Sequence, residues 1–224
     1  MIQTATGTFQ GAGALELYYQ SWRPVPDLER RAVLTIVHGL GEHSGRYGNV
    51  VEYLVPRGVA IYSFDLRGHG RSPGKRGHVN AWSDMRQDLD AFLMLVRRQE
   101  GDLSQFLLGH SLGGLIVLEY VLRHPGETGL RGVIASGPGL STEGISPLLL
   151  KLSRILSRVW PTLSFPTGLD VPGISRDPAV VQAYQNDPLV HGVGTPRAAV
   201  ESSAAIRWTL DHAADWSLPL LILH

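Results

Sequence analysis

Ser111 lies in the segment Gly109-His110-Ser111-Leu112-Gly113, which matches the pattern Gly-x-Ser-x-Gly. A serine between two such glycines is typical of a sharp strand-to-helix turn, because neighbours without a Cβ let the strand and the helix pack closely. At such a turn the hydroxyl is held out at the edge of a sheet. The backbone N–H of Leu112 and the first turn of the following helix then point toward negative charge that forms there. The pattern therefore indicates nucleophilic attack on a carbonyl group.

An ordinary glycine-rich turn can have the same five-residue pattern. The flanking sequence therefore has to distinguish the two interpretations. Residues 105–108 are compatible with a buried strand, and residues 112–122 give a mostly apolar helical pattern. This is the strand, turn and helix setting that a nucleophilic serine of this kind requires. The context favours the nucleophile.

The wider chain alternates predicted strands and helices. Strands are expected at residues 31–37, 59–64, 105–108, 132–136 and 218–223, and helices at residues 47–55, 81–98, 112–122 and 196–216. Residues 2–10 and 14–20 alternate polar and apolar side chains and predict an opening antiparallel hairpin. The alternation predicts an α/β fold, with a mostly parallel central sheet covered by helices on both faces.

The alternation breaks between about Leu140 and Pro196, where proline, glycine and short helical pieces dominate. An insertion into a regular α/β core would have this composition. We therefore expect three parts: a first part of the core at 1–139, an inserted cap at 140–196, and a resumed core at 197–224 that ends after one strand.

The composition limits the classes of function. The chain has 224 residues, with 20 lysines and arginines and 20 acidic residues, so its formal net charge is zero. The overall charge therefore does not indicate a nucleic acid or an anionic membrane as a partner. Cysteine is absent, and no histidines pair at H-x-x-H or H-E-x-x-H spacing, so we expect neither a metal nor a cofactor. The N-terminus lacks the features of a signal peptide, and no apolar run approaches the roughly 18 residues that span a bilayer. We expect a soluble, cytoplasmic protein.

Three loop motifs together resemble the α/β-hydrolase family, and within it the monoacylglycerol lipase and lysophospholipase-like branch. The motifs are HGLGEHSGRY at residues 38–47, DLRGHGRS at 65–72 and GHSLGG at 109–114. The segment NDPLV at residues 186–190 is similar to a short motif near the end of the family's cap. The likeness runs in order through nearly the whole chain.

The resemblance implies roles for particular residues. Ser111 would attack an ester carbonyl, and the backbone N–H groups of Leu40 and Leu112 would form the oxyanion hole. In this family the cap carries the tunnel for the acyl chain and contacts membranes. A lipid ester as substrate, with peripheral membrane contact through the cap, is what the resemblance implies.

The acid and the histidine of a catalytic triad are missing from the expected places. The strand at 132–136 is followed by Gly137 and Pro138 rather than by an acid, and the chain stops at His224 after the next strand. In the family the acid lies just past that strand and the histidine further on, so the chain resembles the first three-quarters of the enzyme. We expect residues 1–224 alone to be nearly inactive, with the apolar edge of the strand Leu220–Leu223 exposed.

Other histidines have simpler interpretations. His124 is expected to cap a helix, His110 to point away from Ser111, and His38, His43 and His69 to shape loops or line the mouth of the site. His191 and His212 fall in the cap region and in the returning helix. An internal triad built from these residues is the less favoured interpretation.

One segment of the expected cap forms an amphipathic helical pattern. Its apolar face comprises Ile145, Leu148, Leu149, Leu152, Leu156 and Val159, and its basic face comprises Lys151, Arg154 and Arg158. Such a helix can lie on a membrane surface. The alternative, which we weigh more heavily, is a cap helix packed over the active site with a solvated basic face.

Three functions remain open. The first is a serine ester hydrolase that cleaves monoacylglycerols or similar lipid esters. The second is a short-chain carboxylesterase on the same fold, which acyl-chain preference would distinguish. The third is a non-catalytic binding module or fragment, because the acid and the histidine of the triad are absent.

Overall fold

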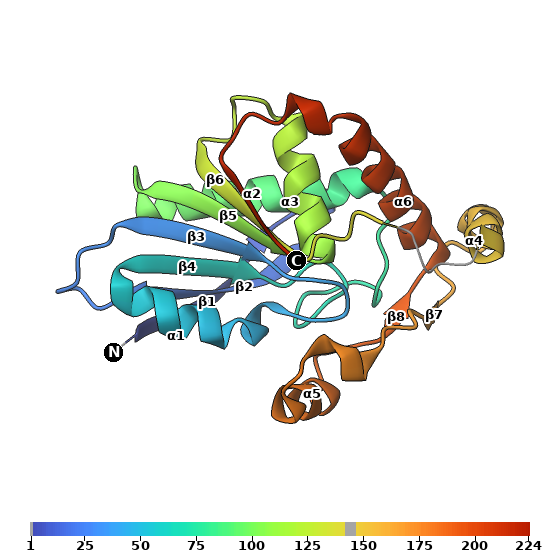
Figure 1. The fold of residues 1–224 in the computed structure, drawn as a ribbon, viewed down its shortest axis with the longest axis horizontal. Helices are drawn as coiled ribbons and strands as arrows, with labels where there is room; N and C mark the ends of the chain where they lie inside the picture. The colour runs from blue at the N-terminus through green and yellow to red at the C-terminus, as the bar shows by residue number, and fades with distance from the viewer. Residues whose placement is uncertain (1, 142–146) are drawn as a thin grey trace.

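The computed structural model describes residues 2–141 and 147–224, and it is built around one seven-stranded sheet (Figure 1). The strands stand in the order β1-β2-β4-β3-β5-β6-β9. They are β1 (Ile2–Gln10), β2 (Glu16–Pro24), β3 (Ala32–Val37), β4 (Val59–Phe64), β5 (Ser104–His110), β6 (Leu130–Ser136) and β9 (Leu220–Leu223). The predicted α/β architecture is confirmed.

The pairing of the strands follows the sequence pattern. β1 and β2 form the predicted antiparallel hairpin, and β2 pairs antiparallel with β4. The pairs β3–β4, β3–β5, β5–β6 and β6–β9 are all parallel. Parallel pairing brings the carboxyl ends of these strands to one edge, where the loops after β3, β4 and β5 meet.

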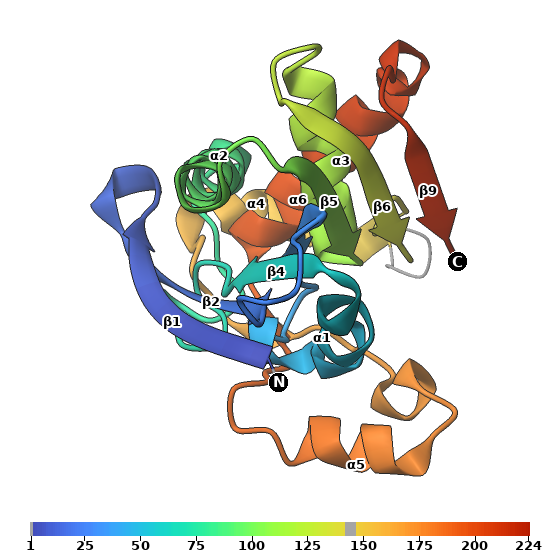
Figure 2. The same ribbon diagram turned by 90° about the vertical axis from the view of Figure 1, so that its left-hand side faces the viewer.

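Helices cover both faces of the sheet, as Figures 1 and 2 show. A large core lies between the sheet and the helices α2 (Trp82–Glu100) and α3 (Leu112–Arg123). A smaller core lies under α1 (Gly48–Leu54) on the other face. The last long helix, α6 (Pro196–Asp211), ends earlier than predicted and is followed by a short 3₁₀ turn at Ala213–Asp215.

The elements between β6 and α6 lie beyond the carboxyl ends of the parallel strands (Figure 1). They are α4 (Pro147–Val159), β7 (Phe165–Pro166), a 3₁₀ turn at Val171–Ile174, α5 (Pro178–Gln185) and β8 (Val193–Gly194). We call residues 147–194 the cap segment. β7 and β8 pair with each other in a separate two-stranded sheet, which the sequence did not predict.

The helix α4 exposes its basic face, as expected, but it also exposes much of its apolar face. Its buried side chains are the small polar Ser153 and Ser157, whereas Leu148, Leu152, Ile155 and Val159 are exposed by 46–75%. α4 packs mainly on α6, so the serines face that helix and the apolar stripe faces outward. Ile145 and the side chain of Leu149, which belong to the predicted stripe, lie outside the described part.

None of the described helices is both long enough and apolar enough to span a bilayer.

The strand β9 lies at one edge of the sheet. Its four side chains are 38–55% exposed, and within the described part of the chain its only strand partner is β6. This agrees with the expectation that Leu220–Leu223 presents an apolar edge. Such an edge favours association with other chains or segments.

The turn from β5 into α3 depends on two glycines. A Cβ at Gly109 would overlap the carbonyl oxygen of Gly113, and a Cβ at Gly113 would overlap the carbonyl oxygen of Val37 at the end of β3. The first turn of α3 therefore packs directly on the backbone of two strands. No larger residue fits either position without displacing backbone.

We predict that Gly113→Ala destabilises the fold by about 1–3 kcal/mol, because the added methyl group displaces the carbonyl of Val37. The sign is diagnostic, since alanine in an unobstructed helix should stabilise by roughly 1 kcal/mol relative to glycine. Urea unfolding followed by tryptophan fluorescence measures the change. Gly48→Ala is the matched control, because a Cβ there meets nothing within 4 Å. A neutral or stabilising Gly113→Ala would contradict the packing described.

Candidate active site

Ser111 occupies the sharp turn that its sequence pattern predicts. It follows β5 directly and precedes α3, with φ 51° and ψ −114°. A positive φ is rare for a residue with a side chain and persists only where the surrounding structure holds it. Here the N–H of Ser111 donates to Ser136 O at 2.9 Å, and the N–H of Gly139 donates to Ser111 O at 2.9 Å. Among the described residues, none is hydrogen-bonded to the Ser111 hydroxyl.

The loop after β3 passes directly beside this turn. A Cβ at Gly39 would lie 3.2 Å from the Ser111 Cβ, so the loop packs closely against the Ser111 side chain. Leu40 is next in the loop, and Leu112 is the first residue of α3. In the described structure no hydrogen bond is made by the N–H of Leu40 or Leu112, and the first N–H groups of a helix have no partner inside it. Their role as oxyanion donors stays a prediction.

Polar contacts from the core hold this loop. His38 is fully buried, and its Nε2 accepts the Leu66 N–H at 2.9 Å. Its Nδ1–H therefore donates to the carbonyl oxygen of Gly39 at 2.8 Å, which fixes the tautomer. Burial lowers the pKa of His38, so the ring is neutral at pH 7. The expectation that His38 shapes a loop is confirmed.

Glu42 also holds this loop, a role that the sequence analysis did not assign to it. Its Oε1 accepts the Gly39 N–H at 2.6 Å and the Tyr47 hydroxyl at 2.9 Å. Burial, followed by the negative charge of Glu42, raises the pKa of Tyr47 well above its usual value, so the phenol keeps its proton and donates. The only signal was the position of both residues within the HGLGEHSGRY motif. Together His38 and Glu42 bind both polar groups of the Gly39 backbone.

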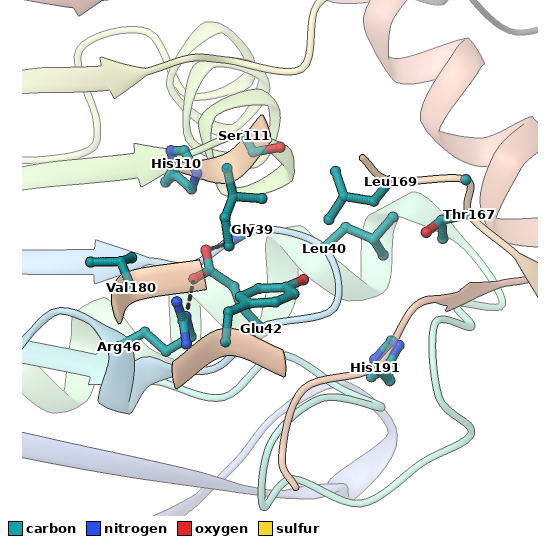
Figure 3. Close-up of a pocket in the computed structure, with 13 residues that line it drawn as sticks. Gly39, Leu40, Glu42, Arg46, His110, Ser111, Thr167, Leu169, Val180 and His191 are labelled. Carbon is teal, nitrogen blue, oxygen red and sulfur yellow. Dashed lines mark hydrogen bonds and ion pairs between the residues drawn. The ribbon is translucent and has the colours of Figure 1, made fainter. Parts of the chain in front are cut away.

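Two cavities lie beside the loop after β3, and Ser111 lines the first of them. The first has a volume of about 360 Å³ and contains the polar side chains shown in Figure 3: Glu42, Arg46, His110, Ser111 and His191. The second has a volume of about 500 Å³ and is lined mainly by apolar side chains, among them Val79, Trp82, Met85, Leu112, Phe165 and Ile206. Leu40, Thr167 and Gly168 line both cavities, so the cavities share a wall next to the nucleophile.

No histidine of the described structure is placed as the base for Ser111. The His110 ring lies on the other side of its backbone from the Ser111 hydroxyl, as predicted, and bonds Ser136 O at 3.0 Å, although it also lines the first cavity (Figure 3). His124 and His212 bond backbone carbonyls of α3 and α6, so the helix-end role of His124 is confirmed. Within the described residues, no group of three or more histidine or acidic side chains is arranged to hold a metal ion.

Comparisons with known proteins identify the family and the fold. Residues 29–224 match the family model described as serine aminopeptidase, S33. A monoacylglycerol lipase of Mycolicibacterium smegmatis is 35% identical over 97% of this chain and 76% of its own length. A putative monoglyceride lipase of Schizosaccharomyces pombe is 35% identical over 93% of this chain, which spans only 56% of that relative.

Solved structures extend the comparison. The crystal structure of the Paleococcus ferrophilus monoacylglycerol lipase superposes with a TM-score of 0.82 at 36% identity, covering 93% of this chain and 77% of that one. A soluble variant of the Saccharomyces cerevisiae monoglyceride lipase superposes with a TM-score of 0.80 at 22% identity, covering 96% and 74%. The second likeness supports the fold alone.

Buried histidines around the site generate a prediction about pH. Burial is the main cause that lowers the pKa of His38, His69 and His191, so all three are neutral in the fold. An unfolded chain binds protons at these residues once the pH falls below about 6.5. The free energy of unfolding should therefore be largest above that pH and decline as the pH falls from 7.5 to 5.5, by up to about 1.4 kcal/mol per pH unit for each histidine.

Urea unfolding at several pH values measures this decline. His69→Gln should reduce the change in the free energy of unfolding per pH unit. The reason is that His69 is only 1% exposed, so the substitution removes one buried imidazole. The control is His224→Gln at an exposed position, which should leave the slope unchanged. A stability that is flat or rises between pH 7.5 and 5.5 would show that these rings are not held neutral.

Proposed function

We propose that this chain, which belongs to the serine aminopeptidase S33 family of α/β hydrolases, supplies the nucleophile and oxyanion hole of a lipid ester hydrolase. The observation that carries the proposal is the position of Ser111. Its backbone is held at a positive φ, and its hydroxyl has no partner among the described residues. Within the described part of the chain, the N–H groups of Leu40, in the loop after β3, and of Leu112, at the start of α3, also make no hydrogen bond.

In the proposed reaction, Ser111 Oγ forms a bond to the carbonyl carbon of an ester while its proton passes to a base. The electron pair of the C=O bond moves to the oxygen, and the N–H groups of Leu40 and Leu112 donate to that oxyanion. Loss of the alcohol leaves an acyl group on Ser111, which water then removes. Each oxyanion donor of this kind contributes roughly 10²–10³-fold to the rate.

The base and its orienting acid are not among the described residues that contact Ser111. The family resemblance places the acid just past the strand Leu220–Leu223 and the histidine further on. This chain spans 76% of the Mycolicibacterium relative, and hydrolysis is proposed for the protein with its base and acid in place. The first three elements of the mechanism, namely nucleophile, oxyanion hole and substrate cavities, lie in residues 1–224.

The two cavities suggest how a lipid ester lies in the site. The mainly apolar cavity of about 500 Å³ suits an acyl chain, because each buried methylene contributes about 0.8 kcal/mol. The cavity of about 360 Å³ contains Glu42 and Arg46, which suit the hydroxyl groups of an alcohol such as glycerol. The ester carbonyl would lie at Leu40, which lines both. A monoacylglycerol combines these parts, and relatives named as monoacylglycerol lipases support the choice.

We predict that Ser111→Ala in the natural protein lowers kcat for monoacylglycerol hydrolysis at least about 10⁴-fold, because it removes the attacking oxygen. The circular dichroism spectrum should be unchanged. Ser104→Ala, at the opposite end of β5, is the matched control and should keep activity within a few-fold. Activity of Ser111→Ala close to that of the unchanged protein would exclude Ser111 as the nucleophile.

The same assay, run over a series of acyl lengths, separates the lipid esterase from the short-chain carboxylesterase. If the apolar cavity holds the acyl chain, kcat/KM should rise from four-carbon to long acyl groups, by up to roughly fourfold per buried methylene. A maximum at two to four carbons would favour the carboxylesterase. Inactivity toward every ester would favour the non-catalytic binding module.

A second part of the proposal concerns the exposed face of α4. Leu148, Leu152, Ile155 and Val159 form an apolar stripe, and the neighbouring Trp160 is 58% exposed. Lys151, Arg154 and Arg158 are also exposed and lie on an adjacent face of the helix. An apolar stripe flanked by cations is typical of helices that lie in a membrane interface. We propose that α4 rests on lipid and brings the cavities to the surface from which substrate enters.

We predict that the double variant Leu152→Ser, Ile155→Ser binds anionic lipid vesicles at least about tenfold more weakly, because each side chain contributes roughly 1.5–3 kcal/mol when fully buried. Vesicle flotation measures the bound fraction. Met94→Ser, at an exposed apolar position on α2, is the control and should bind as the unchanged protein does. Equal binding by all three proteins would remove α4 from the membrane contact.

A further inference from the structure

The end of the cap segment contacts the loop that carries Leu40. The N–H of His191 donates to the carbonyl oxygen of Gly41 at 2.8 Å. Gly41 has φ 79°, and a Cβ there would overlap the carbonyl oxygen of His191. The two backbones therefore touch at the residue that directly follows Leu40. Any displacement of the cap at His191 moves the peptide next to the proposed oxyanion donor.

A side-chain contact joins the same two segments. Asp187 Oδ2 accepts a hydrogen bond from His43 Nε2 at 2.8 Å, and Asp187 Oδ1 accepts the Leu189 N–H at 2.9 Å. His43 Nδ1 accepts the Gly45 N–H at 3.1 Å, so the ring proton is on Nε2 and faces Asp187. The hydrogen bond from His43 lowers the pKa of Asp187, although partial burial opposes this shift. A charged carboxylate of the cap thus binds the middle of the loop.

Arg46 extends this contact toward the nucleophile. Its guanidinium lies over the Tyr184 ring at 4.6 Å, and its Nη1 is 3.9 Å from Asp187 Oδ2. Its Nε is 3.6 Å from Glu42 Oε2, and Glu42 also accepts the Gly39 N–H. The line of contacts from the cap therefore reaches the residues on both sides of Leu40. From the core, the Gly39 side of Leu40 is held by His38, and the far side is held at Ser44, whose N–H donates to Asp65 Oδ1 at 2.8 Å. Gly41 and the His43 ring, which lie between these two points, contact the cap.

We propose that Asp187 is a positioning residue: through His43, and with the His191–Gly41 contact, it holds the loop so that the Leu40 N–H faces the oxyanion. This inference rests on the proposed function and deepens it, because it makes the oxyanion hole depend on the position of the cap. A cap that moved away would leave Ser111 in place, since β5 and α3 hold it, but would release one of its two donors. Asp187 and His43 do not line the apolar cavity, so a substitution at either residue leaves the side chains around the proposed acyl chain unchanged.

Asp187→Asn is the sharpest variant. An asparagine can keep its Oδ1 on the Leu189 N–H, which preserves the local turn. Its amide NH₂ then faces the His43 Nε2–H, so a donor meets a donor and the contact to the loop is lost. We expect kcat, counted per serine titrated by a fluorophosphonate, to fall roughly 10- to 100-fold with KM within about twofold. Asp187→Glu should recover part of the loss.

Controls separate this role from a merely structural one. Asp170→Asn changes another exposed carboxylate of the cap segment and should leave kcat unchanged. In a His43→Ala background, Asp187→Asn should have little further effect, because the two residues act as a pair. A structural role would lower the thermal midpoint and the fraction of titratable serine, yet leave kcat per titrated serine unaltered.

The outcomes distinguish the two proposals. If Ser111→Ala is inactive and Asp187→Asn keeps kcat per titrated serine within about twofold, the positioning role of Asp187 is wrong and the proposed hydrolase stands. Additive effects of His43→Ala and Asp187→Asn would also overturn the positioning role. If Ser111→Ala remains active, the proposed function itself fails, whatever Asp187→Asn does.

Discussion

The close approach of α3 to the ends of β3 and β5 is the constraint on which the site depends. It is possible only because Gly109 and Gly113 have no Cβ, and it forces Ser111 between them into a left-handed conformation. Ser111 lies at the carboxyl edge of the sheet, and its hydroxyl makes no hydrogen bond to any described residue. The free N–H at the start of α3 comes to the same point without any further feature of the sequence.

The loop after β3 and the cap segment surround Ser111 and form the rest of the site. The loop after β3 is held by hydrogen bonds, of which those of the buried, neutral His38 ring and of the Glu42 carboxylate are the main ones. The cap segment supplies the outer walls of two cavities that meet at Leu40. One cavity is polar and the other mainly apolar, so the geometry is suited to an ester that joins a polar alcohol to an acyl chain.

Local patterns were sufficient to predict the sheet, the helices α2, α3 and α6, and the turn at Ser111, because periodicity and glycine spacing act over a few residues. Contacts between distant segments had no such signal. Asp187 and His43 are 144 residues apart, and Glu42 acts on a backbone group rather than on a side chain with a matching pattern. For α4 the sequence left two interpretations open. Its basic side chains are exposed, as both required, but several of its apolar side chains are exposed as well, because Ser153 and Ser157 are the buried side chains of a helix that packs mainly on α6.

The most direct test of the account is a crystal structure of the protein after reaction with a long-chain alkylphosphonate, which stands in for the tetrahedral intermediate of ester hydrolysis. The account predicts a bond from phosphorus to Ser111 Oγ, with the phosphoryl oxygen about 2.7–3.1 Å from the N–H nitrogens of Leu40 and Leu112. The alkyl chain should lie in the cavity formed by Trp82, Met85 and Phe165. Attachment to another residue, or a phosphoryl oxygen that points away from both N–H groups, would contradict it.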